Sequence, residues 1–141
     1  MRKILPFLLL ALFLLPAPME SSEMFLLPRL LLCPSSHAEM IVRKCQRASI
    51  PAHLVLQIVE RESGMDPDVI GENLDAAGNV KSRDFGLGQL NTATIKLLGI
   101  EDPLNPEQNI DGVVTVMQAG HEICGSWSRA MVFYAIGRCA E

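Results

Sequence analysis

The segment Leu54–Gly64 (LVLQIVERESG) constrains the fold more than any other stretch of the chain. Its apolar residues recur at helical spacing, which places one side of a helix against a core. Glu62 lies four residues after Ile58 and seven after Val55, so the face that carries the apolar residues also carries this carboxylate. The final glycine stands where a left-handed residue commonly ends a helix. The pattern therefore predicts a packed helix that presents one carboxylate at its C-terminal end.

Two physical effects act on the Glu62 carboxyl group in the same direction. Partial burial disfavours its charged form, and the negative end of the helix dipole disfavours that form further. A carboxyl group that keeps its proton near neutral pH is suited to general acid catalysis. The same residue could instead be a carboxylate at the rim of the fold, paired with Arg61 or Lys96, because structural ion pairs are common. Both interpretations of Glu62 stay open at this point.

The first 38 residues differ in character from the rest of the chain. Two basic residues precede an apolar run that is too short to span a bilayer and is typical of a secretory signal. A second apolar run follows, and a Ser-His-Ala sequence has small residues at the positions that a signal peptidase reads. We expect residues 1–38 to be a leader that is cleaved after Ala38, with an uncleaved membrane anchor as the alternative. Because the leader is long, translation could also begin at Met19 or Met24.

The remaining residues, 39–141, are expected to form one domain. They hold nine Lys and Arg against fourteen Asp and Glu, a net charge of −5. This balance argues against nucleic acid or an anionic membrane surface as a partner. A membrane contact is therefore expected only through an uncleaved leader.

Three cysteines, Cys45, Cys124 and Cys139, fall in the expected domain. In an oxidising compartment they predict one disulfide and one free thiol. The spacing does not give the pairing, but a bridge that includes Cys139 would fix a C-terminus that otherwise frays. His53 is expected in solvent near a helix start, and His121 at the edge of a core. No spacing among these residues is that of a zinc site, so we expect no metal.

Helical periodicity and turn residues divide the domain into about five short helices and one polar lobe. The helices are expected at residues 39–48, 51–63, 93–98, 106–124 and 127–137. Gly, Asn and Asp dominate the polar lobe, residues 64–84, which suits a small irregular hairpin rather than a real sheet. Asn105 and Pro106 form a helix start, with Gln108 three residues after the cap. The sequence therefore predicts a mainly α, α+β domain whose polar lobe borders a groove.

Four short blocks stand at compatible spacing: ESG at 62–64, DFGLGQLN at 84–91, NPEQNI at 105–110 and FYAIG at 133–137. They resemble, in order, the ES, GLMQ, NPxxNI and AYNxG motifs of the bacterial SLT-type lytic transglycosylases. The resemblance extends over residues 41–139 and implies a lysozyme-like fold with a catalytic cleft. The small size, the leader and the inserted hairpin resemble the specialised members that accompany secretion, conjugation or pilus systems.

The resemblance implies cleavage of the β-1,4 bond between N-acetylmuramic acid and N-acetylglucosamine in peptidoglycan, without a cofactor, in the periplasm or cell envelope. Glu62 would be the single general acid and base, and the product would carry a 1,6-anhydro end. Ser63 would orient Glu62. The resemblance also implies that Gly86 and Leu87 shape the wall of the cleft. It implies that Gln89 and Tyr134 contact the sugar.

Two positions depart from the family pattern. Ala135 stands where the family has Asn, which would weaken the hold on the sugar or on the local backbone. Gly88 stands where the family usually has Met, which would loosen the turn beside the cleft. Ala135 favours the alternative of a glycan-binding or scaffold protein without turnover. A lysozyme-type hydrolase is the other alternative if Asp75 or Asp84 positions a water, although turn chemistry explains both residues as well.

Overall fold

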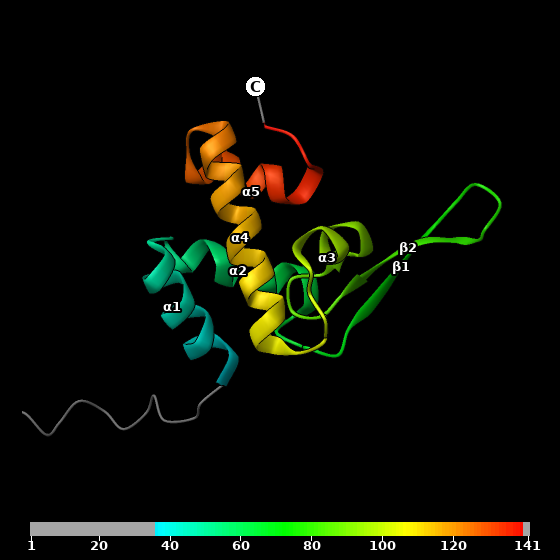
Figure 1. Ribbon diagram of the computed structural model, residues 1–141, viewed down its shortest axis with the longest axis horizontal. Helices are drawn as coiled ribbons and strands as arrows, with labels where there is room; N and C mark the ends of the chain where they lie inside the picture. The colour runs from blue at the N-terminus through cyan, green and yellow to red at the C-terminus, as the bar shows by residue number, and fades with distance from the viewer. Residues whose placement is uncertain (1–35, 140–141) are drawn as a thin grey trace, which may run out of the picture. The chain divides into compact units, whose positions relative to one another are not determined.

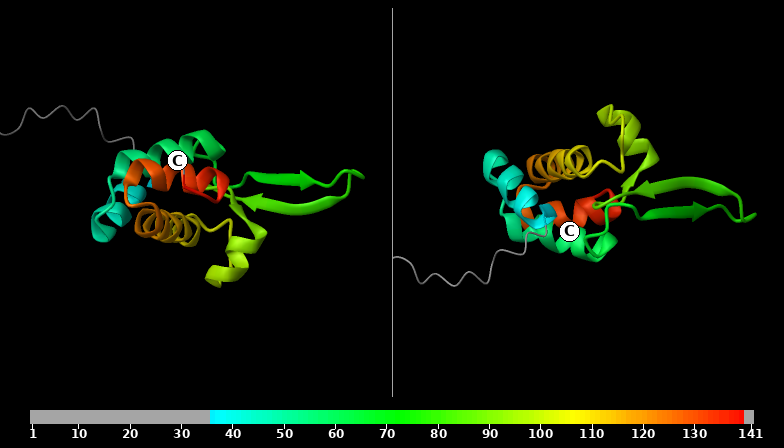
Figure 2. Two further views of the ribbon diagram at one scale, coloured as in Figure 1. Left: turned by 90° about the horizontal axis from the view of Figure 1, so that it is seen from above. Right: turned by 90° about the horizontal axis from the view of Figure 1, so that it is seen from below.

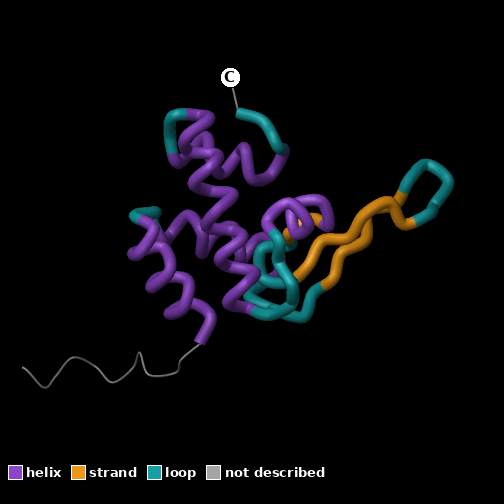
Figure 3. Tube along the Cα trace, in the orientation of Figure 1, coloured by secondary structure: helices purple, strands orange, loops and turns teal. Residues whose placement is uncertain are grey.

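The computed structural model describes residues 36–139, which form five helices and one antiparallel sheet (Figures 1 and 3). In chain order the elements are α1 (Ser36–Ala48), α2 (Ala52–Ser63), β1 (Ile70–Leu74), β2 (Val80–Phe85), β3 (Leu90–Asn91), α3 (Thr92–Leu98), α4 (Pro106–Cys124) and α5 (Trp127–Ile136). The expected leader lies outside the described residues, except for its last three, which begin α1. None of the helices in the described part is long and apolar enough to cross a membrane.

The helices pack around one apolar core that α1, α2 and α4 share. From α2, the buried side chains are those at the predicted helical spacing: Val55, Ile58 and Val59. From α4, the largest fully buried side chains are Ile110, Val113 and Met117. Each such side chain stabilises the fold by roughly 1.5–3 kcal/mol when it leaves water. The shared core therefore fixes the helix that ends at Glu62 against the long helix α4.

The helix ends follow the capping chemistry of the sequence, with one difference. Asn91 caps α3 and Asn105 caps α4, each accepting a backbone N–H of the first turn. The helix start predicted at Asn105 and Pro106 is confirmed, but the Gln108 side chain binds the preceding loop rather than the N-cap residue. Its Oε1 atom accepts the backbone N–H groups of Glu101 and Asp102, both at 3.1 Å. The N–H of Asn105 is already donated to Asp102 Oδ1, which leaves Gln108 free to bind the loop before α4.

The polar lobe forms the expected hairpin, β1-β2, and β3 extends it to a three-stranded sheet in the order β1-β2-β3, which corrects the expectation that no real sheet forms. β1 pairs antiparallel with β2, with an irregularity after Asn73. β3 adds two residues, Leu90 and Asn91, opposite Phe85 and Asp84. The third strand was not predicted because it forms only when a tight turn returns the chain beside β2. Figure 2 shows β1 and β2 extending away from the helices.

A fully buried asparagine on α4 holds the turn between β2 and β3. Asn109 Oδ1 accepts the N–H of Gly88 at 2.8 Å, and Asn109 Nδ2 donates to the carbonyl oxygens of Phe85 and Pro103, each at 2.8 Å. Tyr134 Oη donates to the carbonyl oxygen of Gly88 at 2.6 Å. Both peptide groups of Gly88 are therefore hydrogen-bonded. The expectation that this glycine loosens the turn is wrong.

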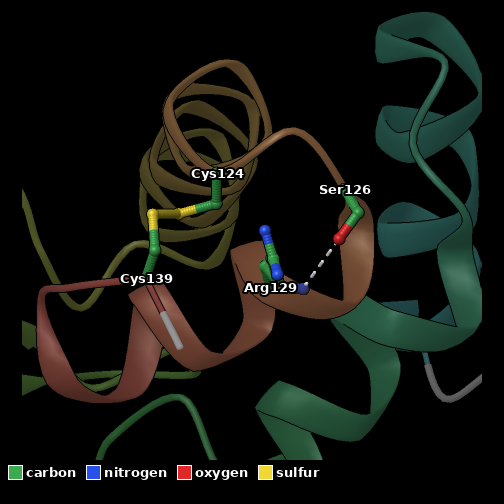
Figure 4. The surroundings of a disulfide bond; sticks show 4 residues. All are labelled: Cys124, Ser126, Arg129 and Cys139. Atoms are coloured by element: carbon green, nitrogen blue, oxygen red, sulfur yellow. Dashed lines mark hydrogen bonds between the residues drawn. A yellow bond between two sulfur atoms is a disulfide. The ribbon is translucent and has the colours of Figure 1, made fainter. Parts of the chain in front are cut away.

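A disulfide between Cys124 and Cys139 joins the end of α4 to the segment that follows α5 (Figure 4). The two Cα atoms are 5.5 Å apart, and the bridge spans the whole of α5. This confirms the prediction of a bridge that includes Cys139, and Cys45 is the free, buried thiol. His121 is half-buried and stacks on Trp127 with ring centroids 4.0 Å apart, which confirms its place at the edge of the core.

Candidate active site

A polar hollow of about 380 Å³ lies where α2, the sheet and α5 meet. From α2 the hollow is lined by Glu62, and from α5 by Tyr134 and Ala135. The sheet and its turn add mostly short polar side chains: Asn73, Ser82, Asp84, Gln89 and Asn91. A wall of hydroxyl, amide and carboxylate groups suits a ligand that is itself rich in hydroxyl and amide groups.

Glu62 lines this hollow from the last turn of α2, and its side chain is 27% exposed. Arg61 donates two hydrogen bonds to Glu62 Oε1, from Nη2 at 2.6 Å and from Nε at 3.1 Å. Glu62 therefore lines the candidate site and is also ion-paired with Arg61, one of the two partners expected from the sequence. The Arg61 side chain is 52% exposed, and exposed ion pairs contribute only about 0.2–1 kcal/mol. A ligand in the hollow can separate this pair at little cost.

Tyr134 is fixed across the hollow with its proton committed to the Gly88 carbonyl oxygen. Burial raises the pKa of the Tyr134 phenol far above its usual value. The negative charge of Glu62 raises this pKa further, with a smaller contribution from Asp84, and the positive charge of Arg61 opposes them. The phenol is therefore neutral, and its oxygen is able to accept a hydrogen bond from a ligand but not to act as a base.

Gln89 lines the hollow from a backbone conformation that is unusual for a residue with a side chain, with φ of 47°. Both hydrogens of its side-chain amide are used, because Nε2 donates to the carbonyl oxygens of Val69 and Gly86, both at 2.9 Å. Only Oε1 remains to face a ligand. A sugar contact at Gln89 must therefore come from a donor on the sugar.

Three predicted site residues do not line the hollow. Ser63 Oγ donates to the Val59 carbonyl oxygen at 3.1 Å, within its own helix, and the described residues include no hydrogen bond between Ser63 and Glu62. Gly86 and Leu87 are buried, and Leu87 belongs to the apolar core. Gly86 has a left-handed φ of 67° and donates its N–H to the Val69 carbonyl oxygen. These two residues support the wall from behind.

Four polar residues on one face of the sheet form a hydrogen-bonded group in the wall, which we call the sheet network. Asp84 accepts Asn73 Nδ2 on Oδ2 and Asn91 Nδ2 on Oδ1, both at 2.7 Å, and Asn91 Nδ2 also lies 3.1 Å from Ser82 Oγ. The sequence analysis identified only Asp84 among them. The register of the sheet brings them together, because it places Asn73 opposite Ser82 and Asp84 opposite Asn91. The sequence alone does not contain this register.

Asp75, the other candidate for a second carboxylate, lies at the hairpin turn. Its carboxylate accepts the backbone N–H groups of Asn79 and Ala77, both at 2.8 Å. The hydrogen bond from the Asn79 backbone, with smaller contributions from the Asn79 side chain and Ala77, lowers the pKa of Asp75. Asp75 is therefore a turn residue, and Asp84 is the only one of the two that lines the hollow.

Among residues 36–139, no group of three or more His, Cys, Asp or Glu side chains could hold a metal ion. The hollow presents one carboxyl group at a helix end, a second in the sheet network, and a neutral phenol. Glu62 reaches the hollow from the end of α2, beside its ion-pair partner Arg61.

A comparison with protein-family models matches residues 39–140 to the transglycosylase SLT domain. No curated protein and no solved structure matches the chain. The match covers most of the chain, and the mainly α arrangement of five helices with a small antiparallel sheet is that of a lysozyme-like fold. The chain therefore belongs to the family of the transglycosylase SLT domain.

Proposed function

We propose that the protein is a peptidoglycan lytic transglycosylase in which Glu62 is the single general acid and base. It cleaves the β-1,4 bond between N-acetylmuramic acid and N-acetylglucosamine and leaves a 1,6-anhydro end. One observation carries the proposal: the carboxylate that ends α2 in the ES motif lines a polar hollow together with Tyr134 and Gln89. Membership of the family supports the class of reaction.

The proposed reaction has two proton transfers, both at Glu62. The protonated carboxyl group first gives its proton to the glycosidic oxygen, and the bond between that oxygen and C1 breaks. The resulting carboxylate then takes the proton of the muramyl 6-hydroxyl group, whose oxygen attacks C1 of the same sugar. Most glycosidases need a second carboxylate as nucleophile or base. Here the attacking group is part of the substrate, so proximity replaces the positioning of a water.

Arg61 must release Glu62 before the first of these steps. Both of its hydrogen bonds go to Glu62 Oε1. Since the Arg61 side chain is about half exposed, a sugar that enters the hollow separates the pair at a cost of about 0.2–1 kcal/mol. Tyr134 Oη and Gln89 Oε1 then accept hydrogen bonds from the hydroxyl and amide groups of the sugar.

The test is digestion of isolated peptidoglycan by the purified protein, with the released muropeptides identified by mass spectrometry. We expect products that are one water lighter than hydrolysis products, and we expect Glu62→Gln to abolish them. Glu60→Gln is the matched control, because Glu60 is an exposed carboxylate on the same helix. Equal release by wild type and Glu62→Gln would exclude Glu62 as the acid. Products with full-mass reducing ends would identify a lysozyme-type hydrolase.

A glycan-binding protein without turnover is the second candidate, and Ala135 favours it. Ala135 is exposed and lines the hollow at the position where the family has Asn, so the hollow lacks one amide there. If the wild type binds peptidoglycan in a pull-down assay but releases nothing, Ala135→Asn is the first variant to assay for a gain of cleavage.

Export to the periplasm or cell envelope is proposed from the sequence of residues 1–38. Fractionation of cells that produce the tagged chain tests it, with processing after Ala38 read by N-terminal sequencing. An association with a secretion, conjugation or pilus apparatus is proposed from the small size and the inserted hairpin. Cross-linking followed by identification of partners tests that association.

A further inference from the structure

Asp84 is a second carboxylate in the hollow, and the two proton transfers proposed for Glu62 leave it without a role. It lies on β2, on the face of the sheet that lines the hollow, whereas Glu62 comes from α2. The charges of both carboxylates reach the phenol of Tyr134 and raise its pKa, after the larger effect of burial. Both charges therefore act on the same small volume.

The sheet network suits Asp84 as a charged group with a fixed position. One amide N–H points at each of its oxygens, from Asn73 and from Asn91 at 2.7 Å. Asn91 is itself held by the start of α3, where its Oδ1 accepts the N–H of Ala93 at 3.1 Å. A carboxylate accepts hydrogen bonds on both oxygens. The two amide groups therefore hold the Asp84 carboxylate in a fixed position.

The charge balance of the hollow changes when Glu62 becomes protonated. Glu62 then no longer compensates Arg61, and the positive guanidinium group opposes the formation of a second positive charge nearby. Asp84 is the only other carboxylate among the residues that line the hollow. It is thus the group that can offset a positive charge on the substrate at the moment when Glu62 acts as an acid.

We propose that Asp84 is the fixed countercharge of the cleavage reaction. This inference rests on the proposed function. When Glu62 protonates the glycosidic oxygen, the bonding electron pair leaves with that oxygen, and positive charge develops on C1 and the ring oxygen. The 6-hydroxyl oxygen then supplies an electron pair to C1 and returns its proton to Glu62. Asp84 exchanges no proton in either step; it stabilises the positive charge between them, because a charge held in place needs no reorganisation.

The test compares variants that differ in charge at one position. Asp84→Glu and Asp84→Gln have the same shape, and only the first keeps the charge; Asp84→Asn is the isosteric neutral variant. We expect Asp84→Asn and Asp84→Gln to lower kcat on peptidoglycan about 100-fold, the scale of losing one electrostatic group of an active site. We expect Asp84→Glu to keep kcat several-fold above Asp84→Gln, with anhydro products throughout.

Glu72→Gln is the matched control. Glu72 lies on β1 of the same sheet, is paired with Arg83 at 2.9 Å and is not among the residues that line the hollow. We expect its kcat to stay near that of the wild type. Thermal unfolding of each variant separates lost catalysis from lost folding, and should Asp84→Asn fail to fold, the Glu and Gln pair makes the same comparison.

Two results would overturn the role of Asp84 while leaving the proposed function intact. The first is a kcat for Asp84→Asn, or for folded Asp84→Gln, within threefold of the wild type. The second is a loss of kcat that is equal in Asp84→Glu and Asp84→Gln, which would mean that shape and not charge matters. Full-mass reducing ends from the wild type that disappear in Asp84→Asn would overturn both proposals, because Asp84 would then act as a base on water. A wild type as inactive as Glu62→Gln would refute the proposed function itself.

Discussion

Gly88 is the position at which one added methyl group tests how tightly the site is packed. A Cβ atom at Gly88 would lie 2.8 Å from Tyr134 Oη, 3.3 Å from Asn109 Oδ1 and closer still to Val113 Cγ2. Val113 and Asn109 are fully buried on α4, and Asn109 is held by three hydrogen bonds. The neighbours therefore cannot move apart independently. Gly88 does not have a positive φ, so a substitution there tests packing and not backbone strain.

The destabilisation by Gly88→Ala has two parts. Forcing an extra carbon into a packed core costs about 1–3 kcal/mol. Displacing Tyr134 weakens its hydrogen bond to the Gly88 carbonyl oxygen, at 2.6 Å in the native protein, which contributes about 0.5–1.5 kcal/mol. We therefore expect the free energy of unfolding to fall by about 2–4 kcal/mol. For a domain of this size the melting temperature should fall by about 10–25 °C.

Urea unfolding followed by circular dichroism measures this change. Gly64→Ala is the matched control, because a Cβ at Gly64 meets nothing within 4 Å and the only cost is the left-handed φ of 61°, about 1–2 kcal/mol. The double variant Gly88→Ala/Val113→Ala should be more stable than the sum of the single effects predicts, since it removes the closest clash. A Gly88→Ala protein within about 0.5 kcal/mol of the wild type would refute the packing argument.

Two further predictions concern the ends of the domain. Cys139→Ser should lower the free energy of unfolding by about 3 kcal/mol, because the disulfide closes a loop of about 15 residues. Calorimetry with and without a reductant measures this change, and an unchanged melting temperature would mean that α5 is held without the bridge. Lys44 pairs with Glu107 and Asp111, each at 2.6 Å. Burial lowers the pKa of Lys44, but hydrogen bonds to the two carboxylates outweigh it and raise that pKa, while the bond from Lys44 lowers the pKa of Glu107. A lowered carboxyl pKa contributes stability above its unfolded value of 4.5 that is lost as the pH falls further. Lys44→Met should therefore flatten the acid side of the curve of melting temperature against pH, and a curve parallel to that of the wild type would contradict the pairing.

The helices could be predicted from the sequence because their signals are local. Asn105 and Pro106 start α4, and Gly64 ends α2, through atoms within a few residues of each end. The Gln108 side chain could not be predicted in the same way, because its partners belong to a loop that must fold back on α4. The third strand was missed for a similar reason, since it depends on a turn held by the distant Asn109.

The sequence motifs identified three of the residues that line the candidate site, but neither the rest of its wall nor its hydrogen bonds. The motifs identified Glu62, Gln89 and Tyr134, and all three line the hollow. They did not reveal that both donors of the Gln89 amide are used, or that Ser63 bonds within its own helix. Sheet register brings Asn73 and its partners into the wall, and register follows from the pairing of β1 with β2 rather than from either strand alone.

The burial of Cys45 prevents its thiol from taking part in disulfide exchange while the protein is folded. Its side chain has no exposed surface, and burial raises the pKa of the thiol. Disulfide exchange requires a thiolate to reach the sulfur that it attacks, and Cys45 meets neither requirement while the core is intact. Among residues 36–139, reduction of the bridge between Cys124 and Cys139 in the folded protein therefore leaves two thiols able to react. Within that part of the chain, re-oxidation of the folded protein restores the native pairing without an isomerase.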